Sequence, residues 1–352
     1  MTLANRRPAT RATAAGLLLG YALDAVIGDP RRGHPVAAFG RLAAALERRT
    51  YASHRGAGAV HVGLLVGGSA VLGVALERLT PRPVARVLVT GAATWAVLGG
   101  RSLRQEAAIL ARQLEAGDLS AARIQITHLV GRDPSRLDAD ELARACVESV
   151  AENTSDAVVA PLLWGAVAGV PGLLAYRAAN TLDAMVGHRS ERYLRFGWAA
   201  ARLDDGLNLA PARVGGLLAA LAAPLVGGSP RAALAVVRRD AARHPSPNAG
   251  VVEAAFAGAL GVRLGGVNVY GGEVEDRGTL GDGRPVVVGD VQRAVRLSRA
   301  TSLLSLGVAV GLTAVVGRLP WFSLTRSPSA GALSVAAARR AHRASGCQGP
   351  HR

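Results

Sequence analysis

The sequence predicts an all-α, polytopic integral membrane protein with about four or five spans or re-entrant segments, whose polar loops form a site on one face. Hydrophobic residues make up 50% of the 352 residues and charged residues only 19%, whereas about 25% of the residues in a typical soluble domain are charged. The mean hydropathy is +0.24. A large soluble helical protein with an alanine-rich core is the alternative that these values leave open.

Six apolar segments supply the candidate spans, at residues 12–27, 56–76, 87–100, 157–176, 214–227 and 302–317. A spanning helix needs about 20 apolar residues, so only the second and fourth segments meet the required length outright. Arg6, Arg7 and Arg11 precede the first segment as in a signal peptide. Because Asp24 interrupts that segment and no convincing small-residue cleavage site follows, we expect a retained first helix.

The polar segments suggest one domain and a tail. Residues 1–318 are expected to form a single membrane-embedded domain, with extramembrane helices and loops at residues 101–156 and 229–300. Within the first of these regions, Asp138 is expected to cap the start of a helix. The Ser/Ala/Arg-rich residues 319–352 are expected to be a poorly ordered tail outside the site.

The charge pattern excludes several classes of chemistry. The formal net charge is +16, and every basic residue apart from histidine is arginine. Without lysine, the chain has neither a Walker-type ATP site nor a Schiff base for pyridoxal phosphate. The excess positive charge suits anionic lipid headgroups or an anionic substrate, and no aromatic-interleaved basic motif indicates nucleic acid. Cys146 and Cys347 predict neither a disulfide framework nor a metal site.

Three acidic residues stand at the mouth of the fourth apolar segment. In a helix, Glu148 and Glu152 lie one turn apart, and Asp156 falls near the same face. Such acids repel one another unless a cation or a basic ligand neutralises them. A solvated helix face is the alternative interpretation. Asn153 lies within the same run and is a candidate to bind substrate.

The apolar segment itself is expected to break. Residues 157–176 carry no charge but include Pro161, Gly165, Gly169, Pro171 and Gly172. A broken segment can re-enter the membrane where protein buries the freed backbone groups. We expect this break to bring both polar flanks of the segment to one face.

Amide and carboxylate side chains recur downstream of the break. Asn180 and Asp183 share a helix face, and Asp204 and Asn208 lie one turn apart beside Asp205. Carboxylate and amide oxygens are hard ligands that suit Mg²⁺. The pattern therefore predicts a magnesium site that includes Asp156.

Three further segments look suited to anions. Pro245 and Pro247 hold the chain extended before a helix, so that Ser246, Asn248 and nearby amides face an anion. A glycine-rich stretch with Arg263 and Asn268 could approach phosphates closely, although glycine is abundant throughout the chain. Asp29 and His34 flank a turn after the first helix, for which a polar helix end is the plainer interpretation.

Together these motifs resemble the CobD/CbiB family, adenosylcobinamide-phosphate synthase of cobalamin biosynthesis. The likeness covers residues from about 15 to 318 and rests on these stretches: Gly28-Asp-Pro30, His34-Pro35, Glu148-x3-Glu-Asn-Thr-x-Asp156, Asn180-Thr-Leu-Asp-x-Met-Val-Gly187, Glu191-Arg-Tyr193, Phe196-Gly-Trp198, Ala201-Arg-Leu-Asp-Asp205, Arg243-His-Pro-Ser-Pro-Asn-Ala-Gly250, Gly261-Val-Arg-Leu-Gly-Gly266 and Tyr270-Gly-Gly272. The combination is far more specific than any one stretch.

The resemblance implies a membrane ligase. An amide would form between a propionate carboxylate of adenosylcobyric acid and the amine of (R)-1-amino-2-propanol or its O-phosphate, driven by ATP with Mg²⁺. It further implies a multi-pass protein of the cell (inner, cytoplasmic) membrane with its active face in the cytoplasm. Partner enzymes of the same pathway could dock on its long loops.

Residue type then suggests roles at the site. Glu148, Glu152 and Asp183 are the catalytic candidates. The magnesium candidates are Asp156, Asp183, Asp204, Asp205 and Asn180. Candidates for substrate or phosphate binding are Asp29, His34, Asn153, Arg189, Arg192, Arg202, Arg243, His244, Ser246, Asn248, Arg263 and Asn268.

Two other functions share some of these features. Membrane prenyltransferases also hold Mg²⁺ and diphosphate with acidic helix motifs, but the Pro/Gly loops fit them poorly. Transporters also break apolar helices and bury acids, but the sequence has no internal repeat between its halves.

Overall fold

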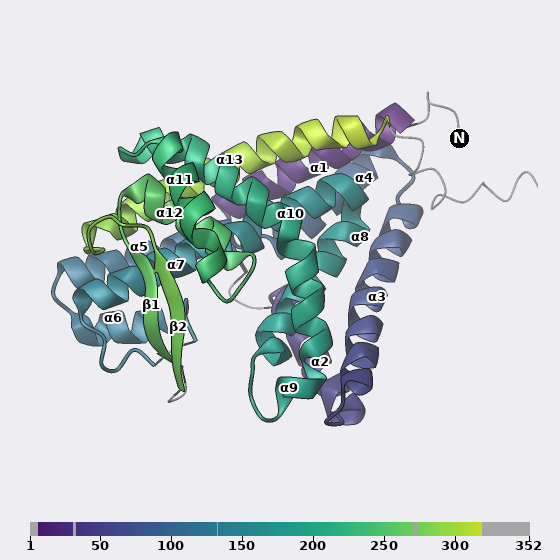
Figure 1. Cartoon of the computed structure of the whole chain (residues 1–352). Helices are drawn as coiled ribbons and strands as arrows, with labels where there is room; N and C mark the ends of the chain where they lie inside the picture. The colour runs from purple at the N-terminus through teal and green to yellow at the C-terminus, as the bar shows by residue number, and fades with distance from the viewer. Residues whose placement is uncertain (1–5, 31–32, 132, 271–272, 319–352) are drawn as a thin grey trace, which may run out of the picture.

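The computed structural model describes residues 6–30, 33–131, 133–270 and 273–318, so the expected tail lies outside the described residues. Helices dominate this part of the chain (Figure 1). The elements in chain order are α1 (Arg6–Val26), α2 (Pro35–Thr50), α3 (Arg55–Leu79), α4 (Pro83–Val97), α5 (Gly100–Glu115), α6 (Leu119–Ile126), α7 (Ala139–Thr154), η2 (Ser155–Val159), α8 (Ala160–Leu182), η3 (Asp183–Gly187), α9 (Tyr193–Phe196), α10 (Trp198–Ala222), η4 (Ala223–Val226), α11 (Pro230–Asp240), η5 (Ala241–Arg243), α12 (Ala249–Leu260), β1 (Leu264–Tyr270), β2 (Glu273–Leu280) and α13 (Gly289–Val316).

Five helical stretches of the described chain are long and apolar enough to cross a membrane, which confirms the predicted class. They are Arg55–Leu79, Pro83–Glu115, Ala139–Gly187, Trp198–Val226 and Gly289–Val316. The predicted segments 214–227 and 302–317 looked short because each is the apolar half of a longer helical stretch whose first half carries polar side chains. Asp138 caps α7 as expected, since its carboxylate accepts the Glu141 N–H at 2.8 Å.

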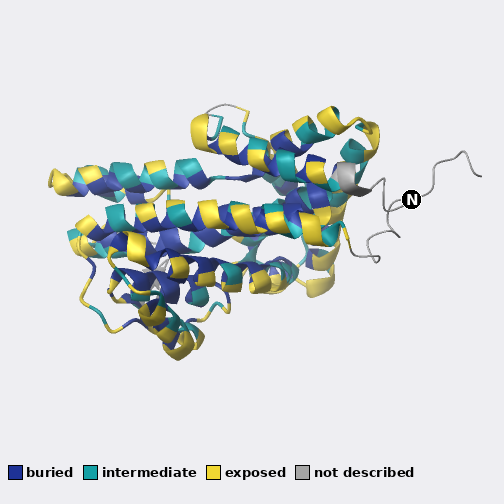
Figure 2. Ribbon diagram, turned by 90° about the horizontal axis from the view of Figure 1, so that it is seen from above, coloured by how far each residue is buried: buried dark blue, intermediate teal, exposed yellow. Residues whose placement is uncertain are grey.

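The buried side chains form a large core between α5, α7, α10, α12 and α13, with smaller clusters around α1 and α4 and around α2 and α3. Exposed residues lie on the outer faces of the helices, where the ribbon is yellow in Figure 2. Close packing of α1 on α4 depends on small residues. A Cβ at Gly16 would strike Thr90, and one at Gly20 would strike Thr94, as is typical of helices that approach closely in lipid.

The predicted break in α8 occurs at Gly169, where φ is 68° and ψ is −146°. Beyond it the chain turns back, because the Tyr176 hydroxyl donates to the carbonyl of Asp156 at 3.1 Å. In an unbroken helix these residues, 20 apart, would be separated by about 30 Å. The Glu77 carboxylate from α3 accepts the freed N–H of Val170 at 3.1 Å and pairs with Arg86 at 3.3 Å.

One element departs from the all-helical prediction. The glycine-rich stretch does not form a loop but enters an antiparallel hairpin of β1 and β2, which projects beside α7 in Figure 1. Its register shifts between Gly265 and Val267, and Gly265 and Gly266 both take positive φ angles, of 76° and 86°. The alternating valines that follow favour an extended strand.

Candidate active site

Four carboxylates from separate parts of the chain gather beside the reversal. Glu152 lies in the last turn of α7, Asp156 in η2, Asp183 in η3 and Asp204 in α10. Asp156 lies within electrostatic range of the other three, and Asp183 within range of Glu152 and Asp204. The reversal at Gly169 therefore brings the two flanks of the apolar segment together around one acidic cluster.

Two of these acids sit on π-helical turns. Asp156 lies in η2, and Asp183 begins η3. A π turn inserts an extra residue into a helix, which loosens the backbone bonding, and such turns are frequent at functional sites. Their coincidence with two members of one acidic cluster makes this place a candidate functional site and favours it over a solvated helix face.

Amide side chains fix the orientation of Asp204. Asn180 donates to one carboxylate oxygen at 3.3 Å, and Asn208 donates to the other at 3.0 Å. The Tyr176 hydroxyl in turn donates to the side-chain oxygen of Asn208 at 2.9 Å. Asn180, predicted as a ligand through its oxygen, thus turns its nitrogen toward Asp204. Asp205, the other acid of the pair, lies 3.5 Å from Arg202.

Tyr176 and Arg177 were not among the predicted site residues, and Asn208 was predicted only through its spacing from Asp204. Tyr176 is 1% exposed and Asn208 equally so, and Arg177 lies within electrostatic range of Asp156. A signal existed, because Tyr176 and Arg177 end the uncharged segment opposite the acids that begin it. That signal can be interpreted only once the chain is known to reverse at Gly169, and the spacing of residues in the sequence does not show how the chain reverses.

Glu148 ties the β-hairpin to α7. Its carboxylate accepts the Gly265 N–H at 2.9 Å, while Arg144 donates to the Gly265 carbonyl and lies 3.7 Å from Glu148. The glycine amide expected to meet a phosphate is therefore used within the chain. Glu148, predicted to be catalytic, holds the hairpin in this structure.

A cavity of about 200 Å³ lies beside this junction. Its lining comes from the segment between α6 and α7, from α7 and from β2: Leu129, Val130, Gly131, Ala145, Glu148, Ser149, Glu152 and Arg277. Glu152 also belongs to the acidic cluster, so it connects the cavity with that cluster. Asn153 is not among these lining residues, and its amide donates to the carbonyl and the hydroxyl of Ser149 at 3.0 and 3.1 Å.

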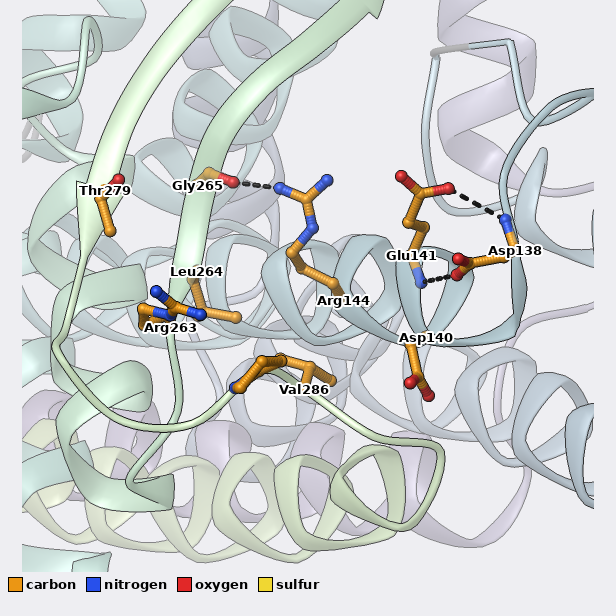
Figure 3. Close-up of a pocket in the computed structure, with 10 residues that line it drawn as sticks. Asp138, Asp140, Glu141, Arg144, Arg263, Leu264, Gly265, Thr279 and Val286 are labelled. Atoms are coloured by element: carbon orange, nitrogen blue, oxygen red, sulfur yellow. Dashed lines mark hydrogen bonds between the residues drawn. The ribbon is translucent and has the colours of Figure 1, made fainter.

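A second pocket, of about 280 Å³, lies at the start of α7 and contains Arg263 (Figure 3). Asp138 and Glu141 face each other there as a helix cap, and Arg144 reaches across to the hairpin. The members of the acidic cluster do not line this pocket. Arg263 is therefore placed apart from the predicted magnesium ligands. Asn268 lies in β1, and its side chain is outside the described part of the structure.

The Pro-rich segment predicted to bind phosphate is occupied by contacts within the chain. The Ser246 hydroxyl accepts the N–H groups of Asn248 and Ala249 at 3.3 and 3.2 Å, so it caps α12. Asn248 donates to the carbonyl of Asp205 at 2.8 Å and accepts from Arg213 at 2.9 Å. These bonds position the start of α12 against α10, next to the acidic cluster.

Arg243 and His244 are engaged as well. Arg243 lies 3.1 Å from Asp240, and the hydrogen bonds from Arg239 hold the pKa of the Asp240 carboxyl below its usual range. Burial, aided by the charge of Arg277, lowers the pKa of His244 to about 4. His244 is therefore neutral at physiological pH, and its Nδ1 accepts the Ser246 N–H at 3.0 Å.

The remaining predicted residues divide between the cluster and the surface. Asp29 lies within electrostatic range of Arg177 and 3.5 Å from His34, which brings the loop after α1 toward the cluster. Arg192 pairs with Glu47 at 2.9 Å, so it ties the loop before α9 to α2. Arg189 and Arg202 are exposed, and no ion pair joins either of them to the four carboxylates of the cluster in the described structure; Arg202 instead lies beside Asp205.

The donor set of the cluster fits magnesium chemically. Within the described ranges, no three His, Cys, Asp or Glu side chains stand close enough to hold a metal ion. Mg²⁺ does not require such a cage, because it usually keeps several waters and takes one or two carboxylates together with substrate phosphates. Four mutually repelling carboxylates supply the oxygen donors and the negative charge for it.

Comparison with known proteins identifies the family. The model of the family described as CobD/Cbib protein matches residues 17–298. The chain belongs to the CobD/CbiB family. Three relatives are each named "Cobalamin biosynthesis protein CobD": that of Mycobacterium tuberculosis is 59% identical over 85% of this chain and 95% of its own length. The Geobacter metallireducens protein is 45% identical over 86% of this chain and 97% of its own length. The Rhodobacter capsulatus protein is 43% identical over 86% of this chain and 98% of its own length. No solved structure matches the chain.

Proposed function

We propose that this CobD/CbiB protein acts in cobalamin biosynthesis as the ligase that joins adenosylcobyric acid to (R)-1-amino-2-propanol or its O-phosphate. The product is adenosylcobinamide or its phosphate, and ATP supplies the free energy. The observation that carries the proposal is the gathering of Glu152, Asp156, Asp183 and Asp204 at one place. The names of the relatives support the pathway.

The reaction requires an activated carboxylate and a neutral amine. A propionate oxygen attacks the γ-phosphorus of ATP, which gives an acyl phosphate and releases ADP. The amine then attacks the acyl carbon, and inorganic phosphate leaves. Glu152 is the residue best placed to accept the ammonium proton, because it faces both the cavity and the acidic cluster.

The acidic cluster would hold the nucleotide by way of a cation. Asp156 and Asp183 would bind Mg²⁺, with Asp204 held beside them by its two amide donors. When bound, the ion would neutralise negative charge on the phosphates and orient them for in-line transfer. Asp204 keeps a fixed orientation without the ion, since Tyr176 and Asn208 hold it from behind.

The same proposal places the protein in the cell membrane, which is the inner membrane in cells that have two membranes. The site would be open to the cytoplasm. The five apolar helical stretches support a multi-pass arrangement. Because ATP is a cytoplasmic substrate, it would reach the acidic cluster from the cytoplasmic side of the membrane.

Reconstitution of the purified protein in lipid nanodiscs tests the function. The protein should convert adenosylcobyric acid, MgATP and either aminopropanol or its phosphate into an amide product and ADP, both measured by mass spectrometry. Asp183→Asn should reduce the rate at least about 100-fold, because it removes a ligand charge from the site. Asp140→Asn, an exposed change on α7, is the matched control and should retain the wild-type rate. Absence of ATP-dependent product from the wild-type protein would refute the assignment.

A further inference from the structure

Arg177 occupies an unusual position in the acidic cluster. It follows Tyr176 on the returning half of α8 and lies within electrostatic range of Asp156 and Asp29. The one hydrogen bond of its guanidinium in the described structure is a long contact of 3.5 Å from Nη1 to the Asn180 side-chain oxygen. Its Nε is buried and has no hydrogen-bond partner among the described residues.

A guanidinium in such a place is poorly satisfied by the protein. It carries five N–H donors in a planar fork, and contacts longer than about 3.2 Å add little. Taking a charge out of water costs several kcal/mol unless close partners replace the water. The acids beside Arg177 attract it at longer range, but none lies within ion-pair distance in the described chain. The geometry leaves most of the fork for an anionic ligand.

We propose that Arg177 binds a phosphate group at the active site, in a bidentate contact that complements a cation on Asp156 and Asp183. Planar guanidinium matches two phosphate oxygens, and carboxylate-bound Mg²⁺ would bind the others. This proposal rests on the proposed function. The phosphate belongs either to ATP or to aminopropanol phosphate, and the two sources share the chemistry that Arg177 recognises.

Direct binding measurements separate the two sources. Isothermal titration of the nanodisc-embedded protein, with Mg²⁺ present, would use a non-hydrolysable ATP analogue in one arm and aminopropanol phosphate in the other. Arg177→Met should weaken binding about 10- to 100-fold in the arm whose phosphate it contacts, as expected for loss of hydrogen bonds to a charged group. Free aminopropanol should bind unchanged. Arg48→Met, at an exposed arginine on α2, is the matched control.

Weakened binding of the nucleotide analogue alone would assign Arg177 to ATP, and weakened binding of aminopropanol phosphate alone would assign it to the amine substrate. Binding of both ligands within twofold of the wild-type value would overturn the proposal. If Arg177→Met does not fold, Arg177→Lys decides the question. It keeps the charge but loses the fork, so several-fold weaker binding is expected, and wild-type affinity for both ligands would count against Arg177. A wild-type protein that binds these ligands but forms no amide would refute the proposed function and leave the role of Arg177 testable.

Discussion

Replacement of Gly169 by alanine should damage both stability and activity, because the chain reverses at this residue. With φ at 68° and ψ at −146°, Gly169 occupies a region that is essentially restricted to glycine and costs other residues about 1–3 kcal/mol. A Cβ there would also strike the Glu77 carboxylate. Displacing that carboxylate breaks its hydrogen bond to Val170, which contributes about 1.5–3 kcal/mol as a bond to a charged group. The backbone strain and the lost hydrogen bond together give about 2.5–6 kcal/mol.

Thermal unfolding in detergent, followed by circular dichroism, measures the loss of stability. The rate of amide formation measures the loss of activity. Gly67→Ala is the matched control, since Gly67 lies in α3 with no heavy atom within 4 Å of an added Cβ. Alanine there should be neutral or stabilise the helix by up to about 1 kcal/mol. Gly169→Ala should instead lower the unfolding midpoint by several degrees and reduce activity, because Asp156 and Asp183 separate when the reversal opens.

A double-mutant cycle with Glu77→Gln sharpens the test. If the added methyl group acts through the Glu77 carboxylate, the two substitutions together should cost less than the sum of their separate effects. A Gly169→Ala protein with the wild-type unfolding midpoint and full activity would refute the reasoning. It would mean that the backbone at this point relaxes into an ordinary conformation without moving the acids.

Two further outcomes are expected. Tyr176→Phe removes the donor to Asn208, so the Mg²⁺ concentration at half-maximal rate should rise about 3- to 10-fold; an unchanged magnesium dependence would exclude this positioning role. The pKa of His244 in the folded protein is about 4, below its ordinary value of 6.5. Between these two values the imidazole is protonated in the unfolded chain but not in the folded protein. The free energy of unfolding therefore falls as the pH drops from about 6.5 to 4. His244→Asn should flatten that decline in thermal-unfolding scans, and an equally steep decline would show that another group is responsible.

The sequence predicted the parts of this structure that depend on local pattern. Apolar length predicted the helical membrane class, and the five proline and glycine residues of segment 157–176 predicted a break in α8, which the structure places at Gly169. The spacing of Glu152 and Asp156, and the recurrence of acids at Asp183 and Asp204, identified the members of the cluster before their positions were known. Each of these signals is contained within about 20 residues of sequence or in the repetition of one pattern.

What sequence spacing could not supply is the partner of each polar side chain. Arg192 and Glu47 are 145 residues apart, and Gly265 and Glu148 are 117 apart. Local sequence does not distinguish an arginine that pairs with a carboxylate of its own chain from one that binds a phosphate. Arg177 was not predicted for the same reason. Its guanidinium lies near Asp156 only because the chain reverses at Gly169, and the sequence does not show that it lacks a close partner there.

The dimensions of the cavity beside Glu152 constrain how the proposed reaction could take place. Its volume of about 200 Å³ is below the 300–1,000 Å³ that a drug-sized ligand occupies, so a corrin ring cannot enter. Aminopropanol or a single propionate arm can. Arg277 from β2 lines the cavity together with Glu148 and Glu152, and its charge would attract the carboxylate of such an arm. The ring would then remain outside, against the hairpin and α7, while the arm alone reaches Glu152 and the acidic cluster. In this proposed arrangement, the hydrogen bond from the Gly265 N–H to Glu148 would hold the hairpin on α7, so that Arg277 and Glu152 keep a fixed distance across the cavity.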